Sequence, residues 1–565
     1  MLRFFAGFVI CLVVFLNLFY NYFFSVNFPF QDDFLLIQFI ETVTRDGLGF
    51  TGFVKELFKT FNDHKAVIPR LIAFIEYSIT GRLDFRFYIL LVLLNITYIF
   101  FFLYLQFRKT KLPLYYFLPA PFLFFHPLYY DISGWALNGM QHSYLTAFTV
   151  TAILFASKRN NTALVGALLC CFLATFTHGN GILSFPAIIF YFLCFKDFKK
   201  AAVTAVVMFV SLAIYLAGYE SGQAVRLPTS ITVFFTSLFA FVGSGFSMWG
   251  NPIVISAVCG AVITAFMVFL FVKASRIYFN AETTVKPGTI ELLTLFAFIF
   301  ITSTVIALFR SWMGTTIASR FQIYAALSIV IFYILLLDYF PFFRKKAALF
   351  VITGLSIFYC SYSYYMYTDV VAGKKTIYLA DVYNWQHNRN MFSVEKTIVE
   401  NGNFYLLPAY EKGFFQLPEP VAGKNQLDSM FVANEKPGAD YSIFLEDWNV
   451  ERLVRDGKEQ LTYHFLGSNL LPGRMRFTGN RFLVLKDNGS GRIYMMNANP
   501  KKEGRRQILT SGNYYKDGFN ALIRQDDLND GIYRLAILDV ENGGKTAFYK
   551  LDKVLSVRNE NLVLK

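Results

Sequence analysis

Long apolar runs separated by short polar loops dominate the first two thirds of the chain. A helix rises 1.5 Å per residue, so crossing hydrocarbon about 30 Å thick takes about 20 apolar residues. The pattern predicts a polytopic α-helical membrane protein with about eleven transmembrane helices. The expected spans are approximately residues 4–24, 87–107, 112–130, 144–157, 162–180, 181–195, 201–218, 252–272, 290–309, 321–338 and 347–367.

The loops between these runs differ in charge from one side to the other. Basic residues gather on one side, which the positive-inside rule assigns to the cytoplasm together with the N-terminus. The basic loops all fall on one side only if residues 231–250 enter and leave the membrane on the outer face, as a re-entrant or interfacial helix does. The inner basic residues are Arg3, Arg108, Lys109, Lys111, Lys158, Arg159, Lys196, Lys199, Lys200, Lys273, Arg276, Lys286, Arg344, Lys345 and Lys346.

Two large regions are expected on the exterior side. In the first exterior loop, residues 25–86, apolar residues recur at helical spacing, which predicts short amphipathic helices along the membrane surface. Beyond the membrane domain at residues 1–368, a mixed α/β connecting segment is expected at 369–439, with a helix near "SVEKTIVEN". Residues 440–565 predict a β-sandwich-like domain, because "RFLVLKDNGSGRIYMMN" and "GIYRLAILDVENGGKTAFYKL" are typical of β-hairpins.

The amino-acid composition agrees with this layout and limits the kinds of molecule that the protein is expected to bind. Of 565 residues 55% are hydrophobic and 16% charged, whereas soluble domains are about a quarter charged. The net charge of +14 lies largely in topology-determining loops, so we expect membrane lipid and no nucleic acid as a partner. All six cysteines lie in apolar runs, and an exterior domain without Cys favours the inner (cytoplasmic) membrane of a bacterium, with that domain periplasmic or extracellular.

An acidic pair follows the first expected span, in "NFPFQDDF". Asp32 and Asp33 are poorly placed for lipid, because a charge at mid-bilayer costs about 2.5–3.5 kcal/mol. We therefore expect the pair to face a polar cavity. The alternative is a solvated interfacial pair that caps the next helix, since Asp is a favoured N-cap residue.

A second polar cluster, "FNDHKAVIPRL", lies later in the same loop and contains Asp63, His64, Lys65 and Arg70. An acid, a base and two cations this close together could bind a metal or a phosphate. A hydrophilic loop without a ligand is the alternative.

A third exterior segment, "FRSWMGTTIASRF", is bounded by Arg310 and Arg320. The planar guanidinium fork suits phosphate oxygens and keeps its charge at any working pH. The alternative is snorkelling of both side chains to lipid headgroups. Two further exterior loops carry amide and aromatic groups that could hydrogen-bond sugar hydroxyls. The alternative is that these residues only terminate helices. They are Trp135, Asn138, Gln141, His142, His178 and Asn180.

The acidic "NFPFQDDF" segment, in a long first exterior loop with surface helices, resembles the GT-C superfamily of glycosyltransferases. The resemblance covers residues 1–370 in layout and implies transfer of a sugar from a polyprenyl-phosphate or polyprenyl-diphosphate carrier to a glycan, lipid or protein acceptor outside the membrane. Asp32 or Asp33 would then deprotonate the acceptor hydroxyl or hold a divalent cation, Mg²⁺ or Mn²⁺. The Trp-Trp-Asp signature of oligosaccharyltransferases is missing, which argues against Asn-glycosylation.

The chemistry of the residues agrees with this resemblance. The chain has neither a Gly-x-x-x-x-Gly-Lys loop nor a dinucleotide fingerprint, so a donor used outside should arrive lipid-linked. Displacing a phosphate at the anomeric carbon needs a base for the attacking oxygen and cations for the departing charge. The resemblance implies inversion at that carbon. Asp32 or Asp33 can supply the base. The cations for the donor phosphate are Arg310, Arg320, Arg70 and Lys65.

Other functions fit a polytopic layout less well. A flippase or transporter for a lipid-linked glycan would place ionisable residues within the spans and show inverted repeats, and the sequence has almost none of the former and no repeat. An envelope polysaccharide polymerase or an O-acyltransferase would also work at the outer face, the latter with a His inside its membrane core. A polysaccharide-binding anchor would need far fewer spans.

Overall fold

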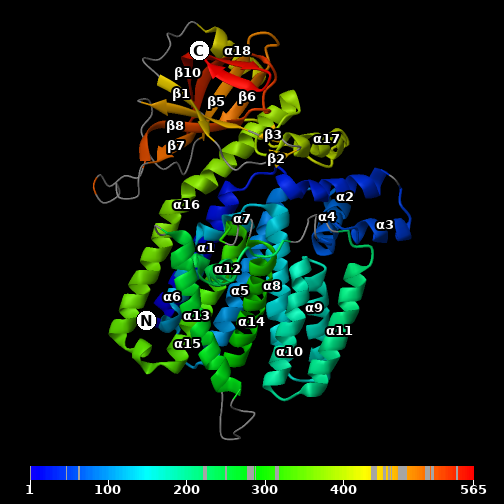
Figure 1. Ribbon diagram of the computed structural model, residues 1–565, viewed down its shortest axis with the longest axis vertical. Coiled ribbons are helices and arrows are strands. Elements are labelled where there is room, and N and C mark those ends of the chain that lie inside the picture. The colour runs from blue at the N-terminus through cyan, green and yellow to red at the C-terminus, as the bar shows by residue number, and fades with distance from the viewer. Residues whose placement is uncertain are drawn as a thin grey trace. The chain divides into compact units, whose positions relative to one another are not determined.

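The chain divides into two compact units (Figure 1). Met1–Ser25 and Leu35–Met366 form the first unit, and Val26–Phe34 and Tyr367–Lys565 form the second. The computed structural model describes residues 2–45, 47–61, 64–220, 226–248, 251–275, 286, 288–311, 317–433, 442–448, 454–455, 458–459, 461–468, 480–502, 510, 515–541 and 545–565.

The first unit is a bundle of helices. Helices are the elements expected of apolar runs, because each satisfies its own backbone hydrogen bonds where no water can do so. The bundle contains α1 (Leu2–Phe24), α2 (Phe34–Arg45), α3 (Phe50–Leu57), α4 (Val67–Thr80), α5 (Phe85–Lys109), α6 (Pro119–Phe124), α7 (Tyr130–Ser133), α8 (Ala136–Ser157), α9 (Asn161–Thr175), α10 (Ser184–Cys194), α11 (Phe198–Leu216), α12 (Ile231–Gly243), α13 (Pro252–Ser275), α14 (Thr289–Phe309), α15 (Gln322–Tyr339) and the start of α16 (Lys346–Asn388).

Seven helices in the described part of the chain are long and apolar enough to cross a membrane: α1, α5, α11, α13, α14, α15 with the turn before it, and α16. Three shorter apolar helices, Asn161–Thr175, Gly179–Cys194 and Ile231–Phe246, fall below that length. A largely helical chain with several helices that suit a membrane is therefore confirmed, whereas the predicted number of about eleven spans is not. Helix α8 has 22 residues, but the polar residues in its first half lower its hydropathy.

Residues 112–130 do not form the single span that their apolar composition predicted. They form α6, with the 3-10 turns η2 (Leu114–Phe117) and η3 (Pro127–Tyr129) on either side of it. The reason is proline, which fixes φ, lacks an N–H and breaks a helix interior. Four prolines interrupt this run: Pro113, Pro119, Pro121 and Pro127.

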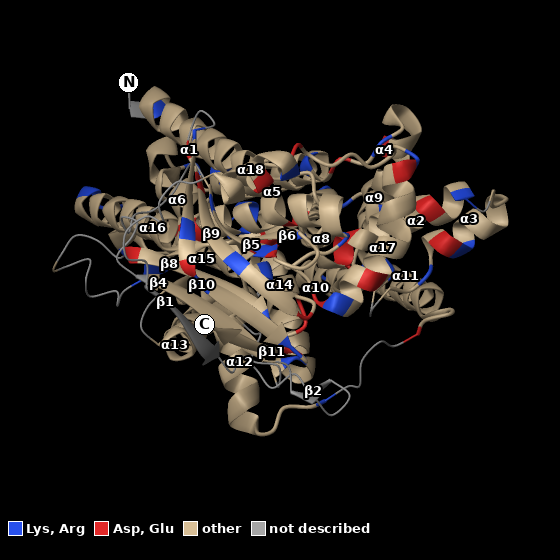
Figure 2. Cartoon of the chain, turned by 90° about the horizontal axis from the view of Figure 1, so that it is seen from above, with Lys and Arg blue, Asp and Glu red and all other residues tan. Residues whose placement is uncertain are grey.

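Residues 25–86, the predicted first exterior loop, contain the three short helices α2, α3 and α4 that their spacing predicted. In Figure 1, α2 and α3 run across one end of the long helices, and in Figure 2 they carry charged residues, whereas α8 and α12 have none. The 231–250 segment forms α12 and the 3-10 turn η5 (Ser244–Phe246) and packs closely on α13. Gly243 and Gly260 allow this approach, since a Cβ on either would meet the other helix's backbone within 2.2 Å.

Several basic residues of the predicted inner loops form ion pairs that sequence reasoning did not foresee. Lys109 Nζ lies 2.9 Å from Glu291 Oε1, at the start of α14. Asp338, near the end of α15, lies 3.4 Å from Lys286 Nζ and 3.6 Å from an Arg344 guanidinium nitrogen. Glu291 and Asp338 therefore neutralise part of the positive charge at this end of the bundle. Which side of the membrane this end faces stays a prediction.

The second unit contains the rest of α16, two further helices and all the described strands. The helices are α17 (Lys396–Glu411), which confirms the helix expected near "SVEKTIVEN", and α18 (Lys424–Val432). The strands are β1 (Ser442–Trp448), β2 (Val454–Arg455), β3 (Lys458–Glu459), β4 (Thr462–Ser468), β5 (Asn480–Asp487), β6 (Ile493–Asn497), β7 (Asn499–Lys502), β8 (Tyr515–Arg524), β9 (Gly531–Val540), β10 (Thr546–Arg558) and β11 (Asn561–Leu564).

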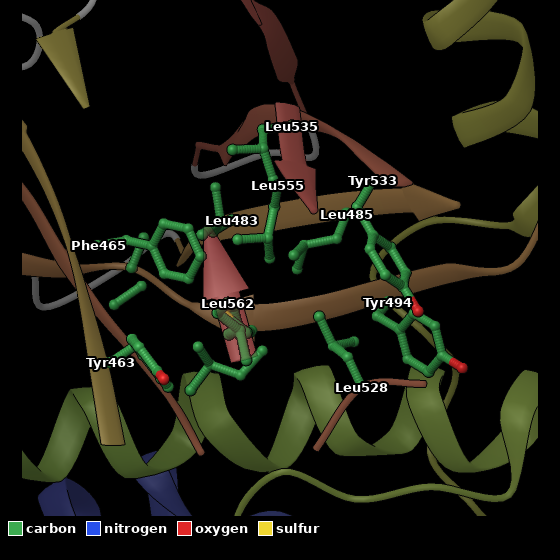
Figure 3. Packing of buried hydrophobic residues seen from close by; sticks show 14 of the residues in the cluster. Tyr463, Phe465, Leu483, Leu485, Tyr494, Leu528, Tyr533, Leu535, Leu555 and Leu562 are labelled. Carbon is green, nitrogen blue, oxygen red and sulfur yellow. The ribbon is translucent and has the colours of Figure 1, made fainter. Parts of the chain in front are cut away.

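The strands form two larger sheets, in the orders β1-β4-β8-β7 and β11-β10-β9-β5-β6. Both predicted hairpins are present as the antiparallel pairs β5–β6 and β9–β10, although the turn residues 542–544 lie outside the described residues. Side chains from both sheets meet in one core (Figure 3), where Phe465 of β4 and Leu483, Leu485 and Leu535 of the other sheet are almost fully buried. The C-terminal domain is therefore mainly β, with two sheets packed face to face.

The other face of the five-stranded sheet is covered by helices of the same unit. Tyr383 of α16 and Leu427 of α18 are buried against Phe482, Val484 and other residues of the sheet. Helix α16 runs without interruption to Asn388, well past residue 367, where the predicted span ended. Apolar composition marks where hydrocarbon ends, but a helix continues for as long as one of its faces is buried.

Glu76 is a buried acid on α4, outside the seven candidate spans. Its Oε2 accepts a hydrogen bond from the Asp84 N–H at 3.3 Å. Burial raises the pKa of Glu76 to about 7, although hydrogen bonds from Tyr88 and Asp84 favour the charged form. Because this pKa is above the ordinary value, the folded state holds the proton more tightly than the unfolded state does.

We expect Glu76→Gln to remove a pH dependence of stability. The contribution of the Glu76 proton is complete below pH 4.5 and is lost as the pH rises through about 7, so the wild type should lose stability relative to the variant over this window. Thermal unfolding of both proteins in detergent at pH 5 and pH 8 measures the difference. An equal gap between their unfolding temperatures at both pH values would contradict this assignment.

Candidate functional site

Three histidines from distant parts of the sequence lie together in the first unit. The ring centroid of His178 lies 3.9 Å from that of His64 and 5.1 Å from that of His142. His142 on α8 is buried, and the other two are half-buried. This group, called the histidine cluster below, unites residues that the sequence predicted only as separate candidates.

Backbone contacts bring His64 to His178. The Phe61 and His64 backbones pair with each other, and the N–H groups of Val67 and Ile68 donate to the Phe176 carbonyl at 2.9 and 3.3 Å. These two bonds satisfy donors at the start of α4, which otherwise have no partner within a helix. The start of α4 is therefore held at the end of α9, directly before His178.

Hydrogen bonds fix the other two rings. His178 begins the turn η4 (Gly179–Leu183), and its Nδ1 accepts from the Asn180 N–H at 3.2 Å. The Asn180 side-chain amide in turn donates to Thr302 Oγ1 on α14 at 3.0 Å. His142 Nδ1 pairs with the Tyr324 hydroxyl of α15 at 3.0 Å. The cluster thus joins the segment before α4 to α8, α14 and α15.

Lys65 is buried beside the cluster. Its Nζ donates to the Ala217 carbonyl at 2.5 Å, and its backbone N–H donates to the Tyr215 hydroxyl at 3.3 Å. Burial lowers the pKa of Lys65. A partly desolvated ammonium at this position favours an anion as a neighbour, because charge interactions strengthen as water is excluded.

Arg310 and Arg320 add positive charge near the histidine cluster. Both charges lie near enough to act on His142 and His178. Arg310 follows the last residue of α14, and Arg320 lies in the turn η8 (Ser319–Phe321), with its guanidinium 5.2 Å from the Phe321 ring. The Phe321 ring lies 5.9 Å from that of His142. Such a set of cations and imidazoles suits phosphate or another anion.

Sequence reasoning missed Asp131, which lies beside this loop. Its N–H donates to Ser319 Oγ at 3.2 Å, and Ser319 donates to the Leu128 carbonyl at 2.5 Å. The backbone of Asp131 is therefore bonded to Ser319, the residue directly before Arg320. Its only sequence signal was an acid directly after a proline-rich run, 112–130, that was assigned to a span.

The sugar-binding candidates on α8 gather at its start. Trp135, Asn138 and Gln141 are all buried, and the Asn138 side chain donates to the Asp131 carbonyl at 2.9 Å. These residues therefore line the same region as His142. Asp63 lies outside the described residues, so its predicted role stays a prediction.

The Arg70 guanidinium is held by contacts with other parts of the protein. Its guanidinium donates to the Leu57 and Lys59 carbonyls at 3.0 and 2.6 Å and lies over the Phe39 ring. Burial lowers the pKa of Arg70 to about 10. These contacts connect the end of α3 to α4, which limits the part of the guanidinium that could reach a phosphate.

Asp32 and Asp33 belong to the second unit, in the 3-10 turn η1 (Gln31–Asp33). Asp33 is buried, and its Oδ2 accepts from the Phe30 N–H at 3.1 Å. Gln31 has a φ of 46°, and a non-glycine residue in such a region costs about 1–3 kcal/mol unless its surroundings hold it. Asp33 thus caps its own 3-10 turn, while Asp32 is half-buried, and the catalytic role predicted for this pair stays a prediction.

A cavity of about 240 Å³ adjoins the Arg310 loop. Hydroxyl groups of α12 and of the residue after Arg310 form part of its wall, with Thr232, Val233, Thr236, Ser237, Ala240, Ile253, Ser311 and Ile317 as its lining. A second cavity of about 270 Å³ between α10, α13 and α14 is almost wholly apolar. Among the described residues no group of three or more His, Cys, Asp or Glu has the arrangement of a metal site.

No protein-family model, curated protein or solved structure matches this chain. The site must therefore be interpreted from its own residues.

We expect Gly181→Ala to destabilise the turn that holds His178 and Asn180. A Cβ at Gly181 would lie 1.9 Å from the Ala174 carbonyl oxygen, and such overpacking costs about 1–3 kcal/mol. Gly354→Ala is the matched control, because nothing lies within 4 Å of its Cβ position. Thermal unfolding in detergent should show a lower midpoint for Gly181→Ala alone, and equal midpoints for the two variants would contradict the packing at η4.

Proposed function

We propose that this protein is a membrane glycosyltransferase that moves a sugar from a polyprenyl-phosphate carrier to an acceptor glycan, lipid or protein at the outer face of a bacterial inner membrane. One observation carries the proposal. His64, His142 and His178 come from three separate segments and lie together in the helical first unit, and the charges of Arg310 and Arg320 act on His142 and His178. A site of imidazoles and guanidinium groups beside apolar helices suits a substrate that is both lipid and anion.

The proposed reaction makes one glycosidic bond and breaks one bond to phosphate. The acceptor oxygen attacks the anomeric carbon, its proton passes to a carboxylate, and the bond between that carbon and the phosphate oxygen breaks with inversion. Asp32 is the proposed base, because it is half-buried and more accessible to an acceptor than Asp33, which is buried. Arg310 and Arg320 are the proposed partners of the phosphate oxygens, which gain charge as the bond breaks.

The two cavities agree with a lipid-linked donor. The cavity beside Arg310 has a largely apolar wall with a few hydroxyl groups that can hydrogen-bond a sugar, and the cavity between α10, α13 and α14 has the apolar lining that an isoprenoid chain requires. A divalent cation, if bound, would neutralise phosphate charge, and Asp32 and Asp33 are its proposed ligands, since Mg²⁺ often takes one or two carboxylates together with substrate phosphate.

We expect Asp32→Ala to lower the rate of transfer about 10²- to 10⁴-fold, the usual contribution of a general base. Reconstituted vesicles supplied with radiolabelled polyprenyl-phosphate hexoses and pentoses provide the measurement, and the exposed Asp552→Ala serves as the matched control. Wild-type activity in Asp32→Ala together with loss in Asp131→Ala would move the base to the first unit. Wild-type activity in both would reject a carboxylate base.

We expect Arg310→Gln and Arg320→Gln each to raise the KM for the donor about 10- to 100-fold, because hydrogen bonds to charged groups are worth about 1.5–3 kcal/mol. Competition by inorganic diphosphate should weaken in parallel. Arg108→Gln, an exposed residue at the end of α5, is the matched control. Unchanged diphosphate inhibition in both loop variants would place the phosphate elsewhere.

A further inference from the structure

The segment that carries Asp32 and Asp33 is built into the C-terminal unit. Residues Val26–Phe34 cluster with Tyr367–Lys565, although α1 before them belongs to the membrane unit. The Asn27 side-chain amide donates to the Gln416 carbonyl at 3.0 Å. At the other end, the Phe34 ring packs on Gly402 of α17, where an added Cβ would lie 3.0 Å from the ring. The segment, called the aspartate turn below, is thus attached at both ends.

Helix α16 holds the middle of the aspartate turn. The Phe30 ring lies 5.5 Å from the Tyr378 ring, and Lys374 Nζ lies 5.6 Å from the Phe30 ring centroid. Phe30 is also the residue that exchanges hydrogen bonds with Asp33, since its N–H donates to Asp33 Oδ2 and its carbonyl accepts from the Asp33 N–H at 3.0 Å. A contact on Phe30 therefore acts on the backbone that carries both aspartates.

The backbone of the aspartate turn needs such support. Gln31 has a positive φ, which a side chain adopts at a cost unless the surroundings impose it. Other residues with a positive φ lie one or two positions after a helix end, where this conformation is common; they are Lys111, Arg159, Lys196 and Arg389. Gln31 instead begins a 3-10 turn, so its conformation depends on the contacts of Asn27, Phe30 and Phe34.

The same stretch of α16 is bound to the β-sandwich. Asp369 forms an ion pair with Lys502 of β7. Thr376 donates to Asn480 Oδ1 at 2.9 Å, and the Asn384 side chain exchanges hydrogen bonds with the backbone of Met495 at 2.7 and 2.8 Å. Contacts thus run continuously from both sheets through α16 to Phe30.

We infer that α16 and the C-terminal domain position the aspartate turn for the reaction, with Tyr378 as a positioning residue that acts on Asp32 through Phe30. This inference rests on the proposed function of Asp32. The C-terminal domain would then contribute to catalysis. Lys374, which lies one helical turn before Tyr378 on α16, would place a cation beside the aspartate turn. A domain that served only to bind an acceptor would not need to hold Phe30.

The test compares Tyr378→Ala with Tyr378→Phe in the full-length protein. Tyr378→Ala removes the ring contact with Phe30, and Tyr378→Phe keeps it. Phe404→Ala, which removes a ring that is 63% exposed on α17, is the matched control. Two quantities are measured in vesicles: hydrogen exchange of the backbone amides of residues 26–34, and kcat and KM for the polyprenyl-phosphate donor.

We expect Tyr378→Ala to speed exchange in the aspartate turn and to lower kcat by about 10²-fold with little change in KM, because a small misplacement of a catalytic group has an effect of this size. Tyr378→Phe and Phe404→Ala should behave like the wild type. Unchanged exchange in Tyr378→Ala overturns the positioning by α16. Faster exchange with unchanged kcat shows that the turn is held but not used in catalysis, which overturns the inference.

Failure of the proposed function gives a different result. A wild-type protein that transfers no sugar from any donor tested rejects the glycosyltransferase proposal and, with it, the catalytic part of this inference. The exchange measurement still decides separately whether α16 holds the aspartate turn.

Discussion

Hydrocarbon offers no hydrogen-bond partner, and this constraint determines where polar chemistry can lie in the first unit. Its long helices are apolar, so charged and imidazole side chains are costly anywhere that protein or water does not satisfy them. The histidine cluster meets this condition with its own partners, since His142 pairs with Tyr324 and His178 accepts from Asn180. Arg310 and Arg320 add positive charge around it. An anionic substrate would offset that charge.

Much of the fold could be predicted from the sequence, because hydropathy and turn chemistry are local signals. The helices of the first exterior loop and the β5–β6 and β9–β10 hairpins follow from spacing and from Gly and Asn turns. The exceptions have physical causes. Prolines break the 112–130 run into short pieces, and burial of one face against the sheet extends α16 past its apolar part.

The candidate site could be predicted only in part. Residue type and predicted topology placed His64, His178 and Arg310 on one side, and the structure brings them together. What a sequence pattern does not encode is which side chains are used in packing. Arg70, a predicted phosphate ligand, donates to backbone carbonyls, and Asp33, a predicted base, accepts a hydrogen bond within its own turn. Asp131 carried almost no signal, because its position depends on a contact with Ser319, far along the chain.

The central claim is that the histidine cluster and the two arginines bind the phosphate of a lipid-linked sugar. The most direct measurement is a cryo-electron microscopy map of the protein in lipid nanodiscs with a non-hydrolysable polyprenyl-phosphonate sugar. We expect the phosphonate within hydrogen-bond reach of Arg310 or Arg320 and beside His178. Density for the phosphonate at the opposite end of the bundle, near Lys109 and Arg344, would contradict the account.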